Sequence, residues 1–119
     1  MEQPFSLTSE VRDRTLVIAT SGYVNNVGGE AIAAEFTRHY DAGIRRVVIN
    51  LAGSKVVNSV GMSFLIEIIE RLQESGGTIV FTNMDPAVEK MLSIMGLFQF
   101  AGRAASVDDA LRGPGGSAP

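Results

Sequence analysis

The chain has 119 residues, 45% of them hydrophobic, with no cysteine, one histidine and a formal net charge of −3, which is typical of one compact domain. The absence of cysteine excludes disulfide frameworks, cysteine nucleophiles and cysteine zinc ligands, and the acidic balance, with no basic run longer than Arg45-Arg46, disfavours nucleic-acid binding. Because the first residues lack a signal-peptide pattern and no apolar run approaches a membrane span in length, we expect a cytoplasmic protein without membrane insertion, metal or cofactor.

Two strands joined by a short turn are predicted at the start of the chain. Residues 5–11 and 15–21 are strand candidates, and the charged turn at 12–14 between them is typical of an antiparallel hairpin. The second segment is apolar on both faces, which places it nearer the middle of a sheet. A polar loop at 22–29 then leads to a helix over residues 30–41.

The rest of the chain alternates strands and helices. A β-branched run at 46–51 predicts a buried parallel strand, and an amphipathic helix over 60–75 follows it. The remaining elements are expected to be a strand at 78–82, a helix opened by Asp85-Pro86 and reaching about residue 95, a short edge strand at 98–100 and a last helical turn or two capped by Ser106.

This order of elements predicts an α/β domain whose central strands are joined by right-handed helical crossovers. We expect a mixed sheet of four to five strands with an N-terminal hairpin and about four helices, within a single domain over residues 1–112. Residues 113–119 are too rich in glycine and proline to pack, so a disordered tail is expected there.

A serine lies between the expected strand at 46–51 and the expected second helix at 60–75. Ser59 precedes the expected first helical residue, Val60, and this spacing favours a helix N-cap that stabilises the helix by about 1 kcal/mol. The same position suits a phosphate, because helix starts carry unpaired N–H groups and the positive end of the helix dipole. The lack of a side chain at Gly61 would let a phosphate or a partner approach those groups closely. Ser59 is therefore either a cap or a switch.

The second helix has more apolar surface than one sheet requires. One stripe is expected to face the sheet, and it consists of Gly61, Phe64, Leu65, Ile68 and Leu72. A flank of Met62, Ile66 and Ile69 lies about a quarter turn away, which widens the apolar arc to about twice the usual width. Either a neighbouring helix covers this flank, or it is a partner-docking surface beside Ser59.

The loop at 22–29 has the glycines of a phosphate cradle without the lysine or the spacing of a nucleotide motif. An ordinary turn in which Asn25 or Asn26 caps the first helix is the simpler interpretation, and a small-ligand site around these two residues is the alternative. No spacing of serine, histidine and carboxylate indicates a hydrolase, so we expect no enzymatic activity.

These features together resemble the STAS domain, the family of anti-sigma factor antagonists and of the cytoplasmic ends of sulphate transporters. The resemblance covers roughly residues 5–111 and rests on Asn58-Ser59-Val60-Gly61-Met62, the strand before it, Gly76-Gly77 with the strand after it, and Gly22 with Asn25. It implies the STAS fold and a bacterial regulator of transcription that works by partner switching. Ser59 would be phosphorylated by an anti-sigma factor that is also a serine kinase, with a phosphatase as a further partner.

The partner surface that the resemblance implies consists of Asn25, Asn58, Val60, Gly61, Met62, Ile66 and Ile69. The family commonly has aspartate where this chain has Asn25 and Asn58, and an amide keeps the hydrogen bonding of aspartate but lacks its charge and base character. The family also includes a second role, as a subunit of a sensory assembly or a lipid-transport ATPase complex. In that role Ser59 would be only a helix cap.

Overall fold

The structure, a computed structural model, describes residues 4–112; the tail expected at 113–119 lies outside the described residues. Five strands form one sheet in the order β1-β2-β3-β4-β5. Their bounds are β1 Ser6–Arg12, β2 Thr15–Ser21, β3 Arg46–Gly53, β4 Thr78–Thr82 and β5 Gly102–Ala104. The first two strands pair antiparallel and all other neighbours pair parallel, so the predicted hairpin and mixed sheet are confirmed.

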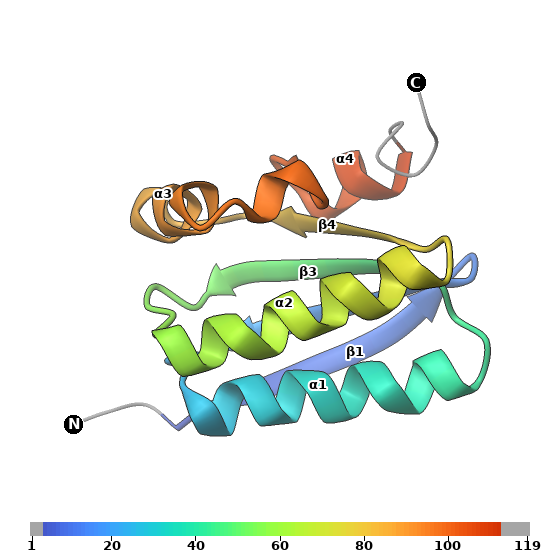
Figure 1. The fold of residues 1–119 in the computed structure, drawn as a ribbon, viewed down its shortest axis with the longest axis horizontal. Helices are drawn as coiled ribbons and strands as arrows, with labels where there is room; N and C mark the ends of the chain where they lie inside the picture. Colours follow the sequence, from blue (N-terminus) through green and yellow to red (C-terminus); the bar gives the residue numbers. More distant parts are fainter. Residues whose placement is uncertain (1–3, 113–119) are drawn as a thin grey trace.

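Helices connect the strands and cover both faces of the sheet. Within the described residues they are α1 Asn26–Asp41, α2 Ser59–Glu74, α3 Pro86–Ile94, the short 3-10 helix η1 Leu97–Gln99, and α4 Val107–Arg112. Figure 1 shows α1 and α2 side by side on one face of the sheet, with the amino-terminal ends of both at the left. The carboxyl ends of the parallel strands lie at that same end, where α2 begins.

The core follows the alternation of side chains along the central strands. One face of the sheet packs beneath α1, α2 and α3, and its buried strand residues are Leu16, Ile18, Val47, Ile49, Leu51, Ile79 and Phe81. The opposite face forms a smaller cluster in which α4 contributes Ala110, against Val17, Val48 and Val80. Because β2 and β3 are buried on both faces, their continuous apolar runs are explained by their central place in the sheet.

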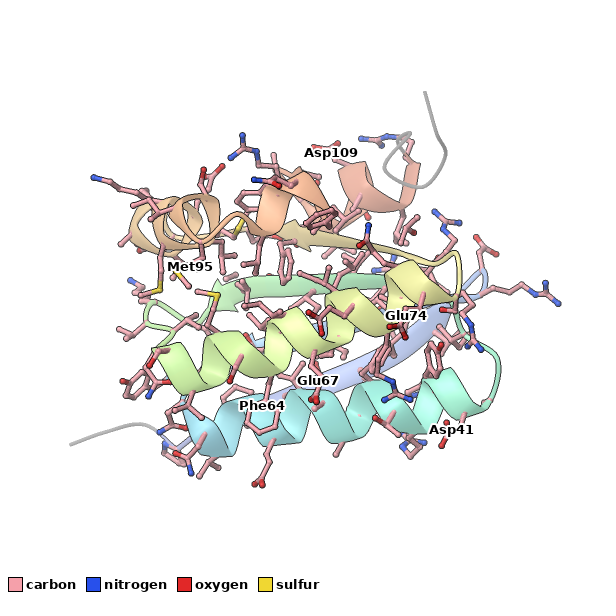
Figure 2. All side chains as sticks on the ribbon, in the orientation of Figure 1. Asp41, Phe64, Glu67, Glu74, Met95 and Asp109 are labelled. Atoms are coloured by element: carbon pink, nitrogen blue, oxygen red, sulfur yellow. The ribbon has the colours of Figure 1, made fainter. Side chains whose placement is uncertain are left out.

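The prediction for α1 begins four residues too late. The helix starts at Asn26, and two glycines that suggested a loop, Gly28 and Gly29, lie buried in its first turn. A Cβ atom at Gly29 would lie 2.5 Å from the ring of Phe64, which Figure 2 shows between α2 and α1. The missing side chain therefore lets the two helices approach each other, and this requirement outweighs the poor helix propensity of glycine.

The edge strand predicted at 98–100 is also wrong. Residues Leu97–Gln99 form the 3-10 helix η1, and the edge strand β5 lies four residues beyond the predicted position, at Gly102–Ala104. The structure instead confirms Asp85 as the cap of α3, since its Oδ1 atom accepts a hydrogen bond from the backbone nitrogen of Ala87 at 3.0 Å. Leu97 is buried in the main core, which explains why tertiary packing outweighs the strand-like pattern here.

Candidate functional site

Two helices begin side by side at the carboxyl ends of β2 and β3, and each is capped by an asparagine. Asn25 Oδ1 accepts a hydrogen bond from the backbone nitrogen of Gly28 at 3.1 Å, and Asn58 Oδ1 accepts one from that of Gly61 at 2.8 Å. The cap predicted at Asn25 is confirmed, whereas the cap predicted at Ser59 is wrong. Asn58 is the N-cap, and Ser59 is the first residue of α2.

The loops that carry the two caps are joined by backbone hydrogen bonds. The nitrogen of Val24 donates to the oxygen of Val56 at 2.9 Å, and the nitrogen of Asn58 donates to the oxygen of Val24 at 3.1 Å. Val24 and Val57 form an isolated parallel bridge, and both side chains are buried. Both helix starts are therefore held in one preformed arrangement, with little freedom to move relative to each other.

Gly61 allows this close approach between the two loops. A Cβ atom at Gly61 would lie 2.2 Å from the carbonyl oxygen of Val24, far closer than any side chain can come. The expectation that a phosphate or partner would use the space beside Gly61 is therefore wrong, because the backbone of Val24 fills it. Gly61 is buried and acts on the site only by positioning α2.

Ser59 itself is exposed at the start of α2. Its hydroxyl group forms no hydrogen bond with any described residue, and its apolar neighbours Val56 and Val60 are 53% and 45% exposed. Neither α1 nor α2 has an acidic residue in its first turn to balance the positive end of the helix dipole. A phosphate added to Ser59 would thus meet favourable electrostatics without displacing a structural contact.

The apolar flank of α2 is only partly available to a partner. Met62 is 2% exposed and Ile69 is 4% exposed, and both belong to the main core, so the expectation of an exposed flank is wrong for these two residues. The alternative, that other elements cover the flank, describes them correctly. Ile66 is half-buried and lines a groove of about 310 Å³ between α2 and the η1 region. The other lining residues are Ile69, Glu70, Gln73, Met95, Gly96, Leu97 and Phe100.

Exposed apolar side chains that sequence reasoning missed lie on α3 and just after η1. Ile94 is 72% exposed, and Met91, Met95 and Phe100 are also exposed. Figure 2 places Met95 at the end of α3 on the side that faces α2. The available signal was the spacing in α3: Val88 and Leu92 form the buried stripe, so Met91 and Met95 must lie beside it.

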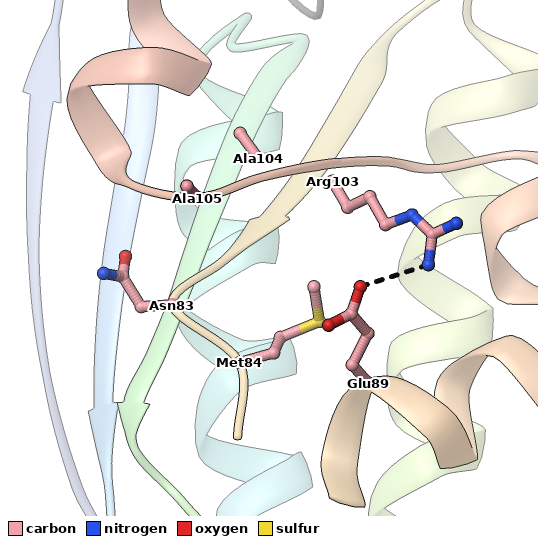
Figure 3. Close-up of a pocket in the computed structure, with 6 residues that line it drawn as sticks. All are labelled: Asn83, Met84, Glu89, Arg103, Ala104 and Ala105. Atoms are coloured by element: carbon pink, nitrogen blue, oxygen red, sulfur yellow. Dashed lines mark hydrogen bonds and ion pairs between the residues drawn. The ribbon is translucent and has the colours of Figure 1, made fainter. Parts of the chain in front are cut away.

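A second cavity, of about 360 Å³, lies beyond the end of β4 and contains none of the predicted site residues (Figure 3). An ion pair crosses it, with Arg103 Nη1 3.1 Å from Glu89 Oε2, so these two charges neutralise each other. Residues 4–112 contain no cluster of three or more acidic or histidine side chains able to hold a metal ion. No helix in the same range has the length and apolar character needed to cross a membrane.

Comparison with known proteins gives consistent results. The family model described as the STAS domain matches residues 6–110. BtrV of Bordetella bronchiseptica, named as a candidate anti-sigma factor antagonist, is 29% identical over 90 residues, which cover 76% of this chain and 78% of BtrV.

Solved structures show the same fold. An anti-sigma factor antagonist from Mycobacterium paratuberculosis matches with a TM-score of 0.80 and 23% identity over 93% of this chain and 96% of that one. The Bacillus cell fate determinant SpoIIAA, in its phosphorylated form, matches with a TM-score of 0.71 and 20% identity over 91% of this chain and 96% of that one. At these identities, the likeness establishes the architecture.

Proposed function

The chain belongs to the STAS domain family, and from that premise we propose that it is an anti-sigma factor antagonist. In this role it binds an anti-sigma factor in the cytoplasm and so releases a sigma factor for transcription, without enzymatic activity of its own. The anti-sigma factor is also the serine kinase that phosphorylates the antagonist, and a phosphatase restores it. The relationship to BtrV supports this assignment, since BtrV carries the same description.

Ser59 is the proposed phosphoacceptor. The observation that carries this proposal is that Asn58, and not Ser59, caps α2, which leaves the Ser59 hydroxyl exposed and without a hydrogen bond among the described residues. Phosphorylation adds about −1.5 to −2 charges at neutral pH, and at this position it leaves the helix cap intact. The modification would therefore change the surface strongly while the fold stays the same, as a partner switch requires.

The neutral amides at Asn25 and Asn58 are compatible with this role. The amide oxygen of Asn58 performs the capping that a carboxylate would perform, so the helix start has the same geometry with either residue. An amide also places no negative charge beside a phosphate on Ser59. The departure from aspartate thus removes charge from the site but does not remove a structural contact.

The partner-docking surface surrounds Ser59 and extends along α2 toward α3. Val60 and Ile66 supply apolar contacts on α2, and Asn25 and Asn58 supply the polar rim at the two helix starts. We add the exposed Ile94 and Met95 to this surface, while the buried residues Gly61, Met62 and Ile69 support it from beneath.

The alternative role, a permanent subunit of a sensory or transport complex, assumed that Ser59 is only a helix cap. Because Asn58 provides the cap, that structural basis for the alternative is lost. The exposed apolar surface near Ser59 would still suit a permanent interface. What separates the two roles is whether Ser59 is modified and whether the modification affects binding.

Phosphate mapping tests the proposed acceptor. The chain is incubated with its cognate anti-sigma factor kinase and ATP, and the modified residue is identified by mass spectrometry. We expect a single phosphate on Ser59 and none on Ser59→Ala. Ser63, an exposed serine one turn further along α2, is a matched internal control. Phosphate on Ser63 in place of Ser59, or on neither residue, would contradict the proposal.

A further inference from the structure

A basic cleft of about 460 Å³ lies at the end of the molecule opposite Ser59. Its lining comes from the turn between β1 and β2 and from the loop between α1 and β3, and it consists of Arg14, Ala42, Gly43, Ile44, Arg45 and Arg46. Both connections lie at the right of Figure 1, whereas α2 begins at the left. The cleft is therefore separate from the proposed partner surface.

The register of the sheet brings the three arginines together. Thr15, the first residue of β2, pairs with Arg46, the first residue of β3, in parallel orientation. The residues just before these two, Arg14 and Arg45, consequently stand at adjacent strand starts. In a chain with net charge −3, this arrangement concentrates three positive charges in one concave place.

No carboxylate lines the cleft to neutralise these charges. Four other arginines of the described chain pair with acidic side chains, namely Arg12, Arg38, Arg103 and Arg112, and Arg71 instead donates to Thr37. Arg46 differs, because its Nε atom is buried and has no hydrogen-bond partner within residues 4–112. A buried guanidinium N–H without an acceptor is costly, and the Arg46 side chain would recover that cost by turning its guanidinium group toward an anion in the cleft.

Arg45 is held rigidly beside this unpaired donor. Its Nη1 atom donates to the carbonyl oxygens of Tyr40 and Ile44, both at 2.9 Å. Its guanidinium carbon also lies 3.7 Å from the centre of the Tyr40 ring. Arg45 thereby offsets the negative end of the α1 dipole, which would otherwise repel an anion. Arg14 and Arg46 then keep their positive charges available to a ligand.

The turn that presents Arg14 uses residues poorly suited to its backbone. Asp13 and Arg14 both have positive φ angles, 49° and 67°, in a two-residue hairpin turn that favours Asn-Gly. Arginine rarely adopts this conformation, so the local backbone gains nothing from its presence. The backbone therefore gives no reason for an arginine at this position, whose side chain lines the cleft.

We propose that this cleft binds a small organic anion through its phosphate group. Guanidinium groups match phosphate oxygens in charge and geometry, and the volume exceeds what inorganic phosphate fills. The ligand would bridge the β1–β2 turn and the α1–β3 loop, with the guanidinium groups of Arg14 and Arg46 as donors. This site lies at the opposite end of the molecule from Ser59, so a ligand bound there leaves the surface around Ser59 uncovered.

Titration with inorganic pyrophosphate at constant ionic strength tests the proposal, with the Nε–H resonance of Arg46 observed by NMR. We expect saturable binding and a shift of that resonance, and at least about tenfold weaker binding for both Arg46→Gln and Arg14→Gln. Arg112→Gln is the matched control, because Arg112 is an exposed arginine paired with Asp109 at a different surface, and it should bind as the wild type does. Backbone amide spectra of each variant verify that the fold is kept.

A second arm identifies the source of the phosphate. Vesicles with and without phosphatidylglycerol are compared for binding of the wild type and of Arg46→Gln. Binding to anionic vesicles alone, lost in Arg46→Gln, would assign the same chemistry to a lipid headgroup. The proposal would be overturned if neither pyrophosphate nor anionic vesicles saturated the protein up to about 10 mM phosphate. It would also be overturned if Arg112→Gln lost as much binding affinity as Arg46→Gln and Arg14→Gln.

Discussion

The side-chain oxygen of Asn58 lies 2.8 Å from the backbone nitrogen of Gly61, and this one contact determines what Ser59 is free to do. Asn58 is the cap of α2, so the hydroxyl group of Ser59 forms no hydrogen bond with any described residue. Under the proposed function, stability and regulation are divided between two adjacent residues. Substitutions at the two positions should separate these roles.

Asn58→Ala should destabilise the protein by about 1 kcal/mol, because it removes the side-chain acceptor of the Gly61 N–H group. Asn58→Asp should keep the cap and equal or exceed the wild type in stability, since a carboxylate also favours the positive end of the helix dipole. Ser59→Ala should change stability by less than about 0.5 kcal/mol. Urea unfolding of the three variants measures these differences, and a larger loss for Ser59→Ala than for Asn58→Ala would contradict the assignment of the cap.

Gly61→Ala should be strongly destabilising. The added methyl group would lie 2.2 Å from the Val24 carbonyl oxygen, so the two loops must separate and their hydrogen bonds must lengthen. We expect a loss of about 2 kcal/mol or more in the free energy of unfolding. Ser63→Ala, in the same helix and exposed, is the control and should lose little. If Gly61→Ala matched that control, the two helix starts would not be as closely joined as described.

Met62→Lys and Ile66→Lys should behave differently although both place a lysine on the same side of α2. Met62 is buried in the main core, so Met62→Lys should unfold the domain or lower its stability by several kcal/mol. Ile66 lines the surface groove, so Ile66→Lys should leave the domain folded and weaken anti-sigma factor binding. Thermal unfolding and binding measured on the same samples distinguish the two outcomes, and a folded Met62→Lys that merely fails to bind would contradict the core assignment.

Glu35 makes stability depend on acid pH. A hydrogen bond from Ser9, followed by contributions from Arg38 and His39, lowers the pKa of Glu35 from 4.5 to about 2. Because the ionised form is favoured in the folded state, its stabilisation is complete above pH 4.5 and is lost as the pH falls toward 2. Glu35→Gln should remove about 1 to 3 kcal/mol of this acid-dependent stability.

Urea unfolding at neutral pH and near pH 3 gives the comparison for Glu35. The difference between the two pH values should be smaller for Glu35→Gln than for the wild type. Glu67→Gln, on the exposed face of α2, should retain the full difference. An unchanged difference in Glu35→Gln would mean that the contact with Ser9 does not stabilise the ionised carboxylate.

The sequence predicted those parts of the fold that local signals determine. The strands at 15–21 and 78–82 have the predicted bounds, because a buried strand appears in the sequence as an apolar run with clear ends. The cap at Asp85 was equally clear, since proline in the next position marks a helix start. The start of α1 was missed because Gly29 is needed for contact with Phe64, a residue far away in the sequence.

The candidate site was predicted less completely, for similar reasons. Spacing predicted Ser59 as the cap, one residue too late, because serine and asparagine both cap helices; the family resemblance is what pointed to Ser59 as a phosphoacceptor. Met62 and Ile69 are buried in one core cluster with Leu92 of α3 and Leu97 of η1, and no pattern within α2 reveals that packing. Exposed contacts such as Ile94 become visible only once that packing is known.

The most direct test of the central claim is the affinity of the cognate anti-sigma factor for Ser59→Ala and Ser59→Asp, measured side by side with the wild type. Because Ser59 is exposed and does not cap α2, both variants should fold with wild-type stability. We expect Ser59→Ala to bind as the wild type does and Ser59→Asp to bind at least about tenfold more weakly. Equal affinity of the two variants would contradict the phosphorylation switch at Ser59.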